Sequence, residues 1–295
     1  MREFTPSKPN VSRFFHRIAP LIMKIMIRIW NITARQNSEL NLIDSSSLDA
    51  VTRQLPDGYY STFRTYDGCR RVLGLKAHLR RLYNPVTSPD VSASFLRRQL
   101  TPLLEHFLPD EARVRLIMTE QGKLYVAAEP LKPLSAEVYE NGVCVETTQI
   151  QRDTPHLKST AFIGASDSER KHIAQEGIFE ALLVKNGKIL EGMTSNFFHV
   201  KDNILYTAQR DILLGVTRRT VIHLARGSGA EVKFQPLKLD QLSDVHEAFI
   251  TSSSRGVVPV IQIDQVTIGQ GSPGGITRML QSAYVDYVMK HAEKI

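Results

Sequence analysis

Two residues near the middle of the chain have the side chains that carbonyl chemistry requires. Lys158 comes three residues after Pro155, and Glu191 is followed by Gly192. A lysine that attacks a carbonyl group must be held in a fixed position and must have a lowered pKa, because only the neutral amine is a nucleophile. Most lysines are solvated surface charges, and the chain has 37 Lys and Arg residues, so residue type alone does not select Lys158.

The elements around Lys158 indicate how its side chain is presented. We expect Lys158 to lie where a strand begins, with a short stretch of chain after it before any helix. A helix should follow, because Ser166 and Glu169 have the S-x-x-E spacing of a capping box. Gly177 provides a typical end signal for that helix. These signals place Lys158 in a short segment between a strand and a helix.

A hairpin is predicted to present Glu191. Residues 179–184 and 188–191 are largely apolar runs on either side of a turn that contains Asn186 and Gly187. Asn-Gly between two such runs is the strongest short-range signal for a β-hairpin. Glu191 would therefore lie at the end of a strand, next to a glycine at which the backbone can approach a ligand.

Residues 190–198, LEGMTSNFF, resemble the E-G-x-x-x-N-x-F signature of the class IV (fold-type IV) pyridoxal-phosphate enzymes. This family includes branched-chain aminotransferases, D-amino-acid aminotransferases and aminodeoxychorismate lyase. The resemblance extends over nearly the whole chain, from about residue 27 to about residue 287. It implies that Lys158 holds pyridoxal 5'-phosphate through its amine. It also implies that Glu191 keeps the ring nitrogen protonated, since a protonated pyridine is the better electron sink.

Three further matches to the family involve residues that suit a phosphate group. The run HLRRL at 78–82 resembles the family's H-x-x-R-L, and the guanidinium of Arg81 is a good phosphate ligand. The run GVTR at 215–218 resembles G-[IV]-T-R, and the start of a helix there offers free N–H groups to an anion. The serine run at 252–254 resembles the family's small-hydroxyl loop. The implied cofactor-binding residues are Arg81, Lys158, Glu191, Val216, Thr217 and Ser253.

The residues expected around the substrate do not select one member of the family. Arg113 and Arg115 occupy the strand on which branched-chain enzymes carry Y-x-R-P, with Arg113 in place of the tyrosine. Tyr60 matches a carboxylate-facing tyrosine of the D-amino-acid enzymes, whose R-x-H pattern is absent after Thr119. Ser254 would face the substrate carboxylate. Residues two apart on a strand share a face. Arg113 and Arg115 therefore either both face the substrate, which would favour an acidic one, or both point away.

The resemblance implies an α/β fold of two domains, with a β-barrel-like core in the larger one and the cofactor between them. The prolines at 130 and 133 make residues 129–134 the best linker in the chain. We therefore expect a basic N-terminal extension at 1–25, a small α/β domain at 26–130 and a large cofactor-binding domain at 131–295. Ser61 departs from the family's D-G-x-[FY]-E motif, which usually has glutamate at that position.

Composition argues against several other classes of protein. Residues 1–25 contain five basic residues and one acidic residue, so this extension carries more than half of the net charge of +7. The body of the chain does not predict a nucleic-acid-binding face. We interpret the extension as a tail or amphipathic surface helix without a catalytic role. No apolar run approaches the roughly 20 residues that span a bilayer. Two cysteines favour a reducing compartment, and the histidines have no metal-ligand spacing.

One apparent nucleotide-binding motif is not interpreted as such. Residues 269–274, GQGSPG, fit G-x-G-x-x-G and precede a predicted helix at 276–292. A dinucleotide site would need a further strand with an acidic residue about 20 residues on, within a βαβ unit. Only the C-terminal tail follows. A comparable region of the family suggests instead a loop that lies over the cofactor site.

We predict a pyridoxal-phosphate-dependent class IV aminotransferase that transfers an amino group between an amino acid and a 2-oxo acid, with branched-chain-like substrates first. Aminodeoxychorismate lyase and D-amino-acid aminotransferase are the alternatives. A non-catalytic binding protein on the same fold is disfavoured because both Lys158 and Glu191 are present. The expected partners are small-molecule substrates and a second copy of the chain, since the family usually forms homodimers. We expect no nucleic acid, no stable membrane anchoring and a cytoplasmic location.

Overall fold

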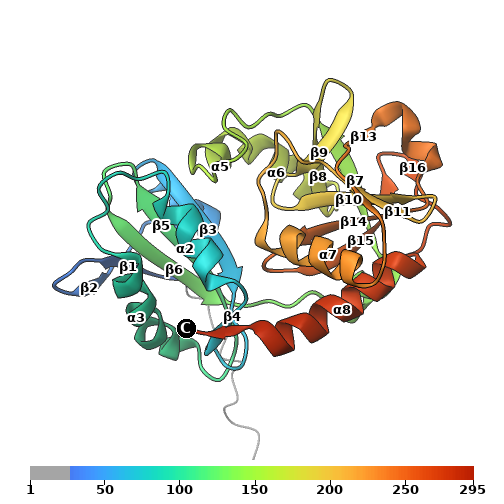
Figure 1. Ribbon diagram of the computed structural model, residues 1–295. Coiled ribbons are helices and arrows are strands. Elements are labelled where there is room, and N and C mark those ends of the chain that lie inside the picture. Colours follow the sequence, from blue (N-terminus) through green and yellow to red (C-terminus); the bar gives the residue numbers. More distant parts are fainter. Residues whose placement is uncertain (1–26) are drawn as a thin grey trace, which may run out of the picture.

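The computed structural model describes residues 27–295 (Figure 1). These residues form a five-stranded sheet, a ten-stranded sheet and a short two-stranded sheet. The N-terminal extension at 1–25, for which we expect a tail or a surface helix, lies outside the described residues. Within 27–295, no helix is both long and apolar enough to cross a membrane.

The first sheet is antiparallel throughout. Its strands are β1 (Arg28–Ile32), β2 (Asn37–Glu39), β3 (Gly58–Arg64), β5 (Ala112–Thr119) and β6 (Leu124–Pro130). They lie in the order β2-β1-β6-β5-β3, so β3 is an edge strand. One face packs against α2 (Leu75–Tyr83) and α3 (Ala93–Leu104), and the other against α1 (Leu48–Arg53). The 3-10 helix η1 (Glu105–Phe107) continues α3.

Helix α3 illustrates how the sequence determines these elements. Ser92 is its N-cap, and the Ser92 hydroxyl accepts a hydrogen bond from the Phe95 N–H at 3.2 Å. Leu96, Leu100 and Leu103 recur at helical spacing and are buried against the sheet. The cap and the leucine spacing together account for the position of α3.

The second sheet closes on itself to form a β-barrel-like core. Its strands are β7 (Val143–Thr148), β8 (Glu180–Lys185), β9 (Lys188–Gly192), β10 (Asn196–Lys201), β11 (Ile204–Thr207), β12 (Val232–Lys233), β13 (Leu237–Lys238), β14 (Glu247–Ser252), β15 (Gly256–Ile263) and β16 (Val266–Thr267). The order is β12-β11-β10-β14-β15-β7-β8-β9-β13, and β16 pairs with β15. The register pair Asn196–Glu191 joins β10 to β9 and closes the ring. The expected mixed α/β fold with a barrel-like core is confirmed.

Helices surround this second sheet and one of them connects it to the first. They are α4 (Ala136–Asn141), α5 (Ala161–Ala165), α6 (Asp167–Gln175), α7 (Val216–Gly227), η2 (Leu239–Asp244) and α8 (Gly275–His291). After α8, strand β17 (Glu293–Lys294) pairs with β4 (Arg71–Val72), so the C-terminus lies beside the first sheet (Figure 1). Contacts therefore cross residues 130–131, where we propose that the two domains divide.

The helix start predicted at Ser166 is correct in position but not in its capping bond. Helix α6 begins at Asp167, directly after Ser166. The Ser166 hydroxyl donates to the Phe162 carbonyl oxygen at 2.6 Å and makes no capping bond to α6. The reason is that α5 ends at Ala165, so Ser166 also terminates a helix and its hydroxyl bonds backward along the chain.

The glycine-rich loop at 269–274 does not lie over the Lys158 site, and that expectation is wrong. The Gly269 N–H donates to the Val245 carbonyl oxygen at 3.1 Å, which holds the loop beside the start of β14. Glu247 then caps α8, accepting from the Thr277 N–H and hydroxyl, each at 2.7 Å. The serines expected near the cofactor lie at the opposite end of β14, at 252–254. The loop at 269–274 therefore leads into α8 and lies away from those serines.

Candidate active site

Lys158 lies in the loop between β7 and α5, not at the start of a strand as we expected. Its carbonyl oxygen accepts from the Tyr60 N–H at 2.9 Å. Ser159 forms an isolated bridge with Tyr59, and the Thr160 N–H donates to the Gly58 carbonyl oxygen at 2.9 Å. The loop is thus hydrogen-bonded to the edge strand β3, because that strand has free backbone groups to offer. Lys158 is fixed between the two sheets.

The surroundings of the Lys158 amine favour its neutral form. Burial lowers the pKa of Lys158 well below its usual value, and the nearby cations of Arg152 and Arg81 lower it further, against an opposing effect of Glu191. The Lys158 Nζ atom lies 4.9 Å from the centre of the Tyr60 ring. A neutral amine in a fixed position is what nucleophilic attack on a carbonyl requires.

Glu191 is buried, and three donors hold its carboxylate. Oε1 accepts from Arg152 Nε at 3.0 Å, while Oε2 accepts from Asn196 Nδ2 at 3.1 Å and from the Leu213 N–H at 3.0 Å. Burial raises the pKa of Glu191 to about 7, although Arg152 and the Leu213 N–H favour the ionised form. The β8–β9 hairpin that presents Glu191 has the strands and turn that we predicted.

Arg152 belongs to this site but was not identified from the sequence. Besides Glu191, it donates through Nη2 to the Met193 carbonyl oxygen, and its guanidinium carbon lies 3.8 Å from the centre of the Phe162 ring. Its Nη1 atom is buried and has no partner among residues 27–295. No local pattern marks this residue, because its partner Glu191 is 39 positions away along the chain.

The residues expected to bind phosphate surround one narrow space of about 40 Å³ beside Lys158 and Glu191. Helix α7 starts there with Gly215 as N-cap and no side-chain cap. Arg81 Nη2 donates to the Leu214 carbonyl oxygen at 2.7 Å. Burial and the neighbouring Arg219 lower the pKa of Arg81 to about 10, so the side chain stays cationic although no acidic side chain in the described part of the chain pairs with it. The lining includes all the expected residues, namely Arg81, Lys158, Glu191, Val216, Thr217 and Ser253.

A larger cavity of about 440 Å³ adjoins this space. Thr62, Lys158, Thr194 and Ser252 line both, so they mark the junction. The four residues expected to contact substrate all line the larger cavity: Tyr60, Arg113, Arg115 and Ser254. We call it the substrate cavity.

The orientation of the two strand arginines, which the sequence left open, is toward the substrate cavity. Arg115 is buried and bonded at two of its nitrogens: its Nη1 atom lies 2.7 Å from Asp49 and donates to the Leu48 carbonyl oxygen, and its Nε atom donates to Thr62 Oγ1 at 3.2 Å. Arg113 Nη1 lies 3.1 Å from Glu129, while its Nε atom is buried without a partner in the described chain. Arg115 therefore shapes the wall, and Arg113 keeps more capacity for a ligand.

Ser61, which replaces the family's usual glutamate, is buried behind this site. Its hydroxyl lies 2.9 Å from His78 Nδ1. Burial and the nearby Arg81 lower the pKa of His78 well below its usual value. A hydroxyl can bond to the Nδ1 atom of a neutral imidazole, so this contact needs no carboxylate, while the Nε2 atom of His78 is buried without a partner among residues 27–295.

Comparison with known proteins identifies the family. The model described as amino-transferase class IV matches residues 58–263, which is more than half of the chain. The chain belongs to the class IV aminotransferase family. It is therefore an enzyme of the pyridoxal-phosphate-dependent transaminase class, as the sequence indicated.

The relatives of this class IV aminotransferase carry three different names. It is 28% identical over 265 residues to a D-alanine aminotransferase of Bacillus licheniformis, covering 82% of this chain and 91% of the relative. It is 30% identical over 261 residues to a putative branched-chain-amino-acid aminotransferase of Methanocaldococcus jannaschii, covering 81% and 90%. It is also 30% identical over 255 residues to an aminodeoxychorismate lyase of Bacillus subtilis, covering 77% and 84%.

Solved structures agree on the fold. A putative branched-chain amino acid aminotransferase from Thermotoga maritima superposes with a TM-score of 0.73 at 26% identity, covering 89% of this chain and 96% of the other. An aminotransferase from Brucella abortus bound to the cofactor PLP gives 0.70 at 19% identity, covering 89% and 99%. These likenesses establish the fold-type IV architecture and leave the specific reaction open.

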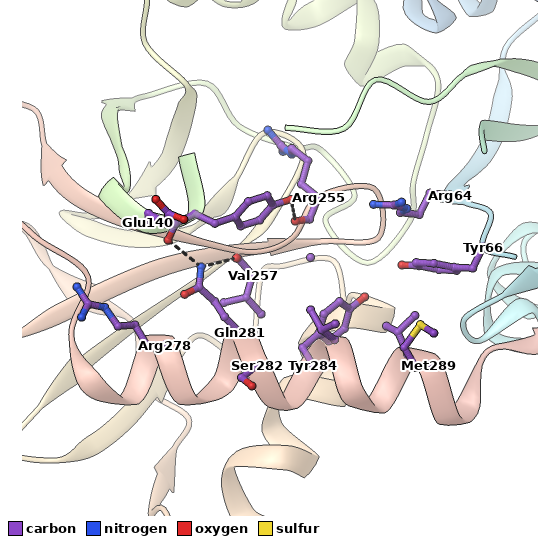
Figure 2. Close-up of a pocket in the computed structure, with 14 residues that line it drawn as sticks. Arg64, Tyr66, Glu140, Arg255, Val257, Arg278, Gln281, Ser282, Tyr284 and Met289 are labelled. Atoms are coloured by element: carbon purple, nitrogen blue, oxygen red, sulfur yellow. Dashed lines mark hydrogen bonds between the residues drawn. The ribbon is translucent and has the colours of Figure 1, made fainter. Parts of the chain in front are cut away.

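A further cavity of the aminotransferase is a groove of about 760 Å³ along α8 (Figure 2). Tyr139, Tyr284 and Met289 contribute to its lining, and neither Lys158 nor Glu191 does. It therefore lacks the groups that carbonyl chemistry needs. Among residues 27–295, no group of three or more His, Cys, Asp or Glu side chains could hold a metal ion.

Proposed function

We propose that this chain binds pyridoxal 5'-phosphate through Lys158 and transfers an amino group between an amino acid and a 2-oxo acid. One observation carries the proposal. Lys158, with a lowered pKa, lies at the junction between a space lined by the expected phosphate-binding residues and a cavity large enough for a small substrate. The family to which the chain belongs supports the same chemistry.

The residues around the narrow space fit this cofactor. Arg81 is a half-buried cation that pairs with no acidic side chain among residues 27–295, which favours a phosphate group nearby. The start of α7 offers uncapped N–H groups at the positive end of the helix dipole. Glu191 can accept a hydrogen bond from a protonated ring nitrogen, and Arg152 holds that carboxylate in place. The space of about 40 Å³ must widen when the cofactor binds.

Some side chains of the site would bind the cofactor, and the Lys158 amine would also transfer a proton. Pyridoxal phosphate, when bound, supplies an electron sink for the negative charge that develops at the substrate α-carbon. Lys158 would hold the cofactor through its side-chain amine. When it is not bonded to the cofactor, this amine, which burial and nearby cations keep neutral, would move a proton from the substrate α-carbon to the C4′ carbon of the cofactor. The ionised form of Glu191 would pair with the protonated ring nitrogen.

The other predicted residues are proposed for anchoring. Arg81 and the start of α7 would hold the phosphate group, with the Thr217 hydroxyl and Ser253 completing its ligands. Tyr60 packs beside the Lys158 amine and would limit the movement of the substrate. Ser254 would face the substrate carboxylate. Arg113 and Arg115 would line the region that receives the substrate side chain.

A branched-chain-like 2-oxo-acid aminotransferase is our first proposal for the specific activity. Aminodeoxychorismate lyase and D-amino-acid aminotransferase are the alternatives, and the relatives' names include all three. Engagement of Arg115 by Asp49 removes one cation that an acidic substrate would use, which favours transamination with an aliphatic side chain. We also propose a homodimer, which the mass of the purified protein in light scattering would test.

A half-reaction distinguishes these activities. The purified protein is expected to be yellow, and borohydride reduction should add the cofactor mass to the peptide that contains Lys158. Mixing it with single L- or D-amino acids without an acceptor should bleach the colour and release the matching 2-oxo acid if it is a transaminase. If no amino acid bleaches it but aminodeoxychorismate yields pyruvate, it is the lyase. A colourless protein that takes up no cofactor would refute the proposal.

A further inference from the structure

Arg255 lines both the substrate cavity and the groove of about 760 Å³ along α8, which we call the outer groove. It therefore lies between the two. It follows the serine run 252–254 on the loop between β14 and β15. In Figure 2 its side chain extends away from α8. Its side chain is 22% exposed, so it is accessible from a cavity without being a surface residue.

The Arg255 guanidinium is fixed on one side only. Nη2 lies 2.7 Å from Glu180 Oε2 and 2.5 Å from Thr194 Oγ1, and Nε lies 3.3 Å from Ser252 Oγ. Glu180 is buried, and its side chain is 2% exposed. No described residue accepts a hydrogen bond from Nη1. Two nitrogens of the guanidinium group are therefore held in place, and the third has no partner among residues 27–295. A guanidinium group in this state can bind an anion through the third nitrogen.

The backbone of the loop is fixed as well. The Tyr139 hydroxyl donates to the Arg255 carbonyl oxygen at 2.8 Å. Gly256 follows with a φ of 70°, which favours glycine, and a Cβ atom there would come within 3.2 Å of the Tyr284 ring. These two contacts hold the backbone of Arg255 in one position.

Two partners of Arg255 locate it along the path of the substrate. Thr194 and Ser252 belong to the four junction residues that line both the cofactor space and the substrate cavity. Lys158 is also one of the four, and the substrate α-carbon must lie beside its amine. Arg113 bonds to Glu129, outside this junction, so it lies farther along the cavity. Arg255 is thus one of the arginines of the substrate cavity that are held at the junction, together with Arg115, whose Nε atom donates to Thr62 Oγ1 at 3.2 Å.

We propose that Arg255 binds the α-carboxylate of the amino-acid substrate, with Glu180 as the residue that positions its guanidinium. The carboxylate is attached directly to the α-carbon, so a cation held at the junction can reach it. The side chain of the substrate is then directed toward Arg113. This inference rests on the proposed function, and it assigns a binding role to a residue that the family motifs do not mark in this chain.

The test compares an amino acid with its carboxamide, which keeps the amine and lacks the charge. L-Valine with L-valinamide and D-alanine with D-alaninamide are used, and the pair whose acid reacts in the half-reaction is followed. Cofactor content is measured first by absorbance. In R255Q the apparent dissociation constant of the acid should rise by about 10- to 100-fold, as expected for loss of a charge-assisted hydrogen bond. The limiting bleaching rate should change far less, and the amide should be unaffected.

Matched variants separate this role from a structural one. R255K should recover part of the lost affinity because it keeps the positive charge. R278Q alters an exposed arginine of the outer groove and should behave as wild type. Equal losses for acid and amide in R255Q would mean that Arg255 only supports Thr194, and the proposal would be wrong. No loss in R255Q, or the same loss in R113Q instead, would also overturn it.

Two further outcomes would overturn the proposal, and the first does not depend on how the variants fold. If the wild-type protein binds the amide as tightly as the acid, no positively charged side chain binds the α-carboxylate and the proposal fails. If L-glutamate alone loses affinity in R255Q, Arg255 binds a side-chain carboxylate and our assignment is wrong. Failure of the proposed function is distinct from both, because then no amino acid bleaches the protein.

Discussion

Arg152 Nε and Glu191 Oε1 lie 3.0 Å apart, and their side chains are 5% and 2% exposed. This buried ion pair joins the loop that carries Lys158 to the strand that ends at the barrel closure. Removing one partner of such a pair leaves the other charge buried without compensation, which costs more than the pair itself contributes. The pair therefore couples the position of the reactive lysine to the folding of the barrel.

Replacing Arg152 with methionine should destabilise the protein by about 3 to 5 kcal/mol, because Glu191 is then left as an uncompensated buried carboxylate. Urea unfolding at a fixed cofactor concentration measures the change. The double variant R152M/E191Q should lose less than R152M alone, since it removes the isolated charge. A double variant that is less stable than the single one would contradict this explanation.

Replacing Arg81 with methionine should weaken pyridoxal 5'-phosphate binding by about 10- to 100-fold, because a charge-assisted contact to phosphate is lost. Binding of pyridoxal, which has no phosphate group, should change little. Absorbance titration of the cofactor-free protein with each compound provides the comparison. Equal weakening for both compounds would place Arg81 away from the phosphate.

Cofactor affinity should depend on the ionisation of Glu191. Burial raises the pKa of Glu191 to about 7, so the carboxyl group gains a proton as the pH falls through that value. The protonated form cannot pair with a protonated ring nitrogen, and affinity should therefore fall by up to about tenfold per pH unit below 7. The phosphate group of the cofactor also titrates in this range. The E191Q variant isolates the effect, since its profile should keep only the phosphate contribution.

His199 should make the protein sensitive to acid. Burial lowers the pKa of His199 to about 4, whereas an unfolded histidine titrates near 6.5. Between these values the unfolded chain binds more protons, so the free energy of unfolding falls as the pH falls from about 6.5 to about 4, by about 3 kcal/mol in total. H199F keeps a ring to stack beside Tyr206, 4.9 Å away in the native protein, and should lose that dependence. Parallel urea titrations of the two proteins across this range would show it.

Local signals predicted the elements well, because their causes lie within a few residues. The β8–β9 turn follows from Asn186 and Gly187, both of which have positive φ angles in the structure. The start of α7 follows from the Gly-Val-Thr run, and the residues matched to the family meet around one space. Where backbone preference decides the structure, sequence is sufficient.

Contacts between distant segments were not predictable in the same way. Arg152 has no motif of its own, and its role depends on Glu191 across 39 positions. The period of two in a strand places Arg113 and Arg115 on the same face but does not say which face. The face is evident only from the position of α1, which brings Asp49 to Arg115. The loop at 269–274 was misplaced because Val245 and Glu247, distant in sequence, determine where it lies.

The barrel closes at a single register pair, Asn196 with Glu191, and Asn196 also donates to the Glu191 carboxylate. The residue proposed for the cofactor ring is thus also part of the wall of the cylinder. A substitution at either position alters the architecture and the chemistry together. Arg113 and Arg115 lie on β5 of the first sheet, which does not contribute to the closure of the barrel. A substitution at either of them therefore does not alter the closure. New substrates can therefore be accommodated by changes in the first sheet while the closure stays intact, and one scaffold can support several related activities.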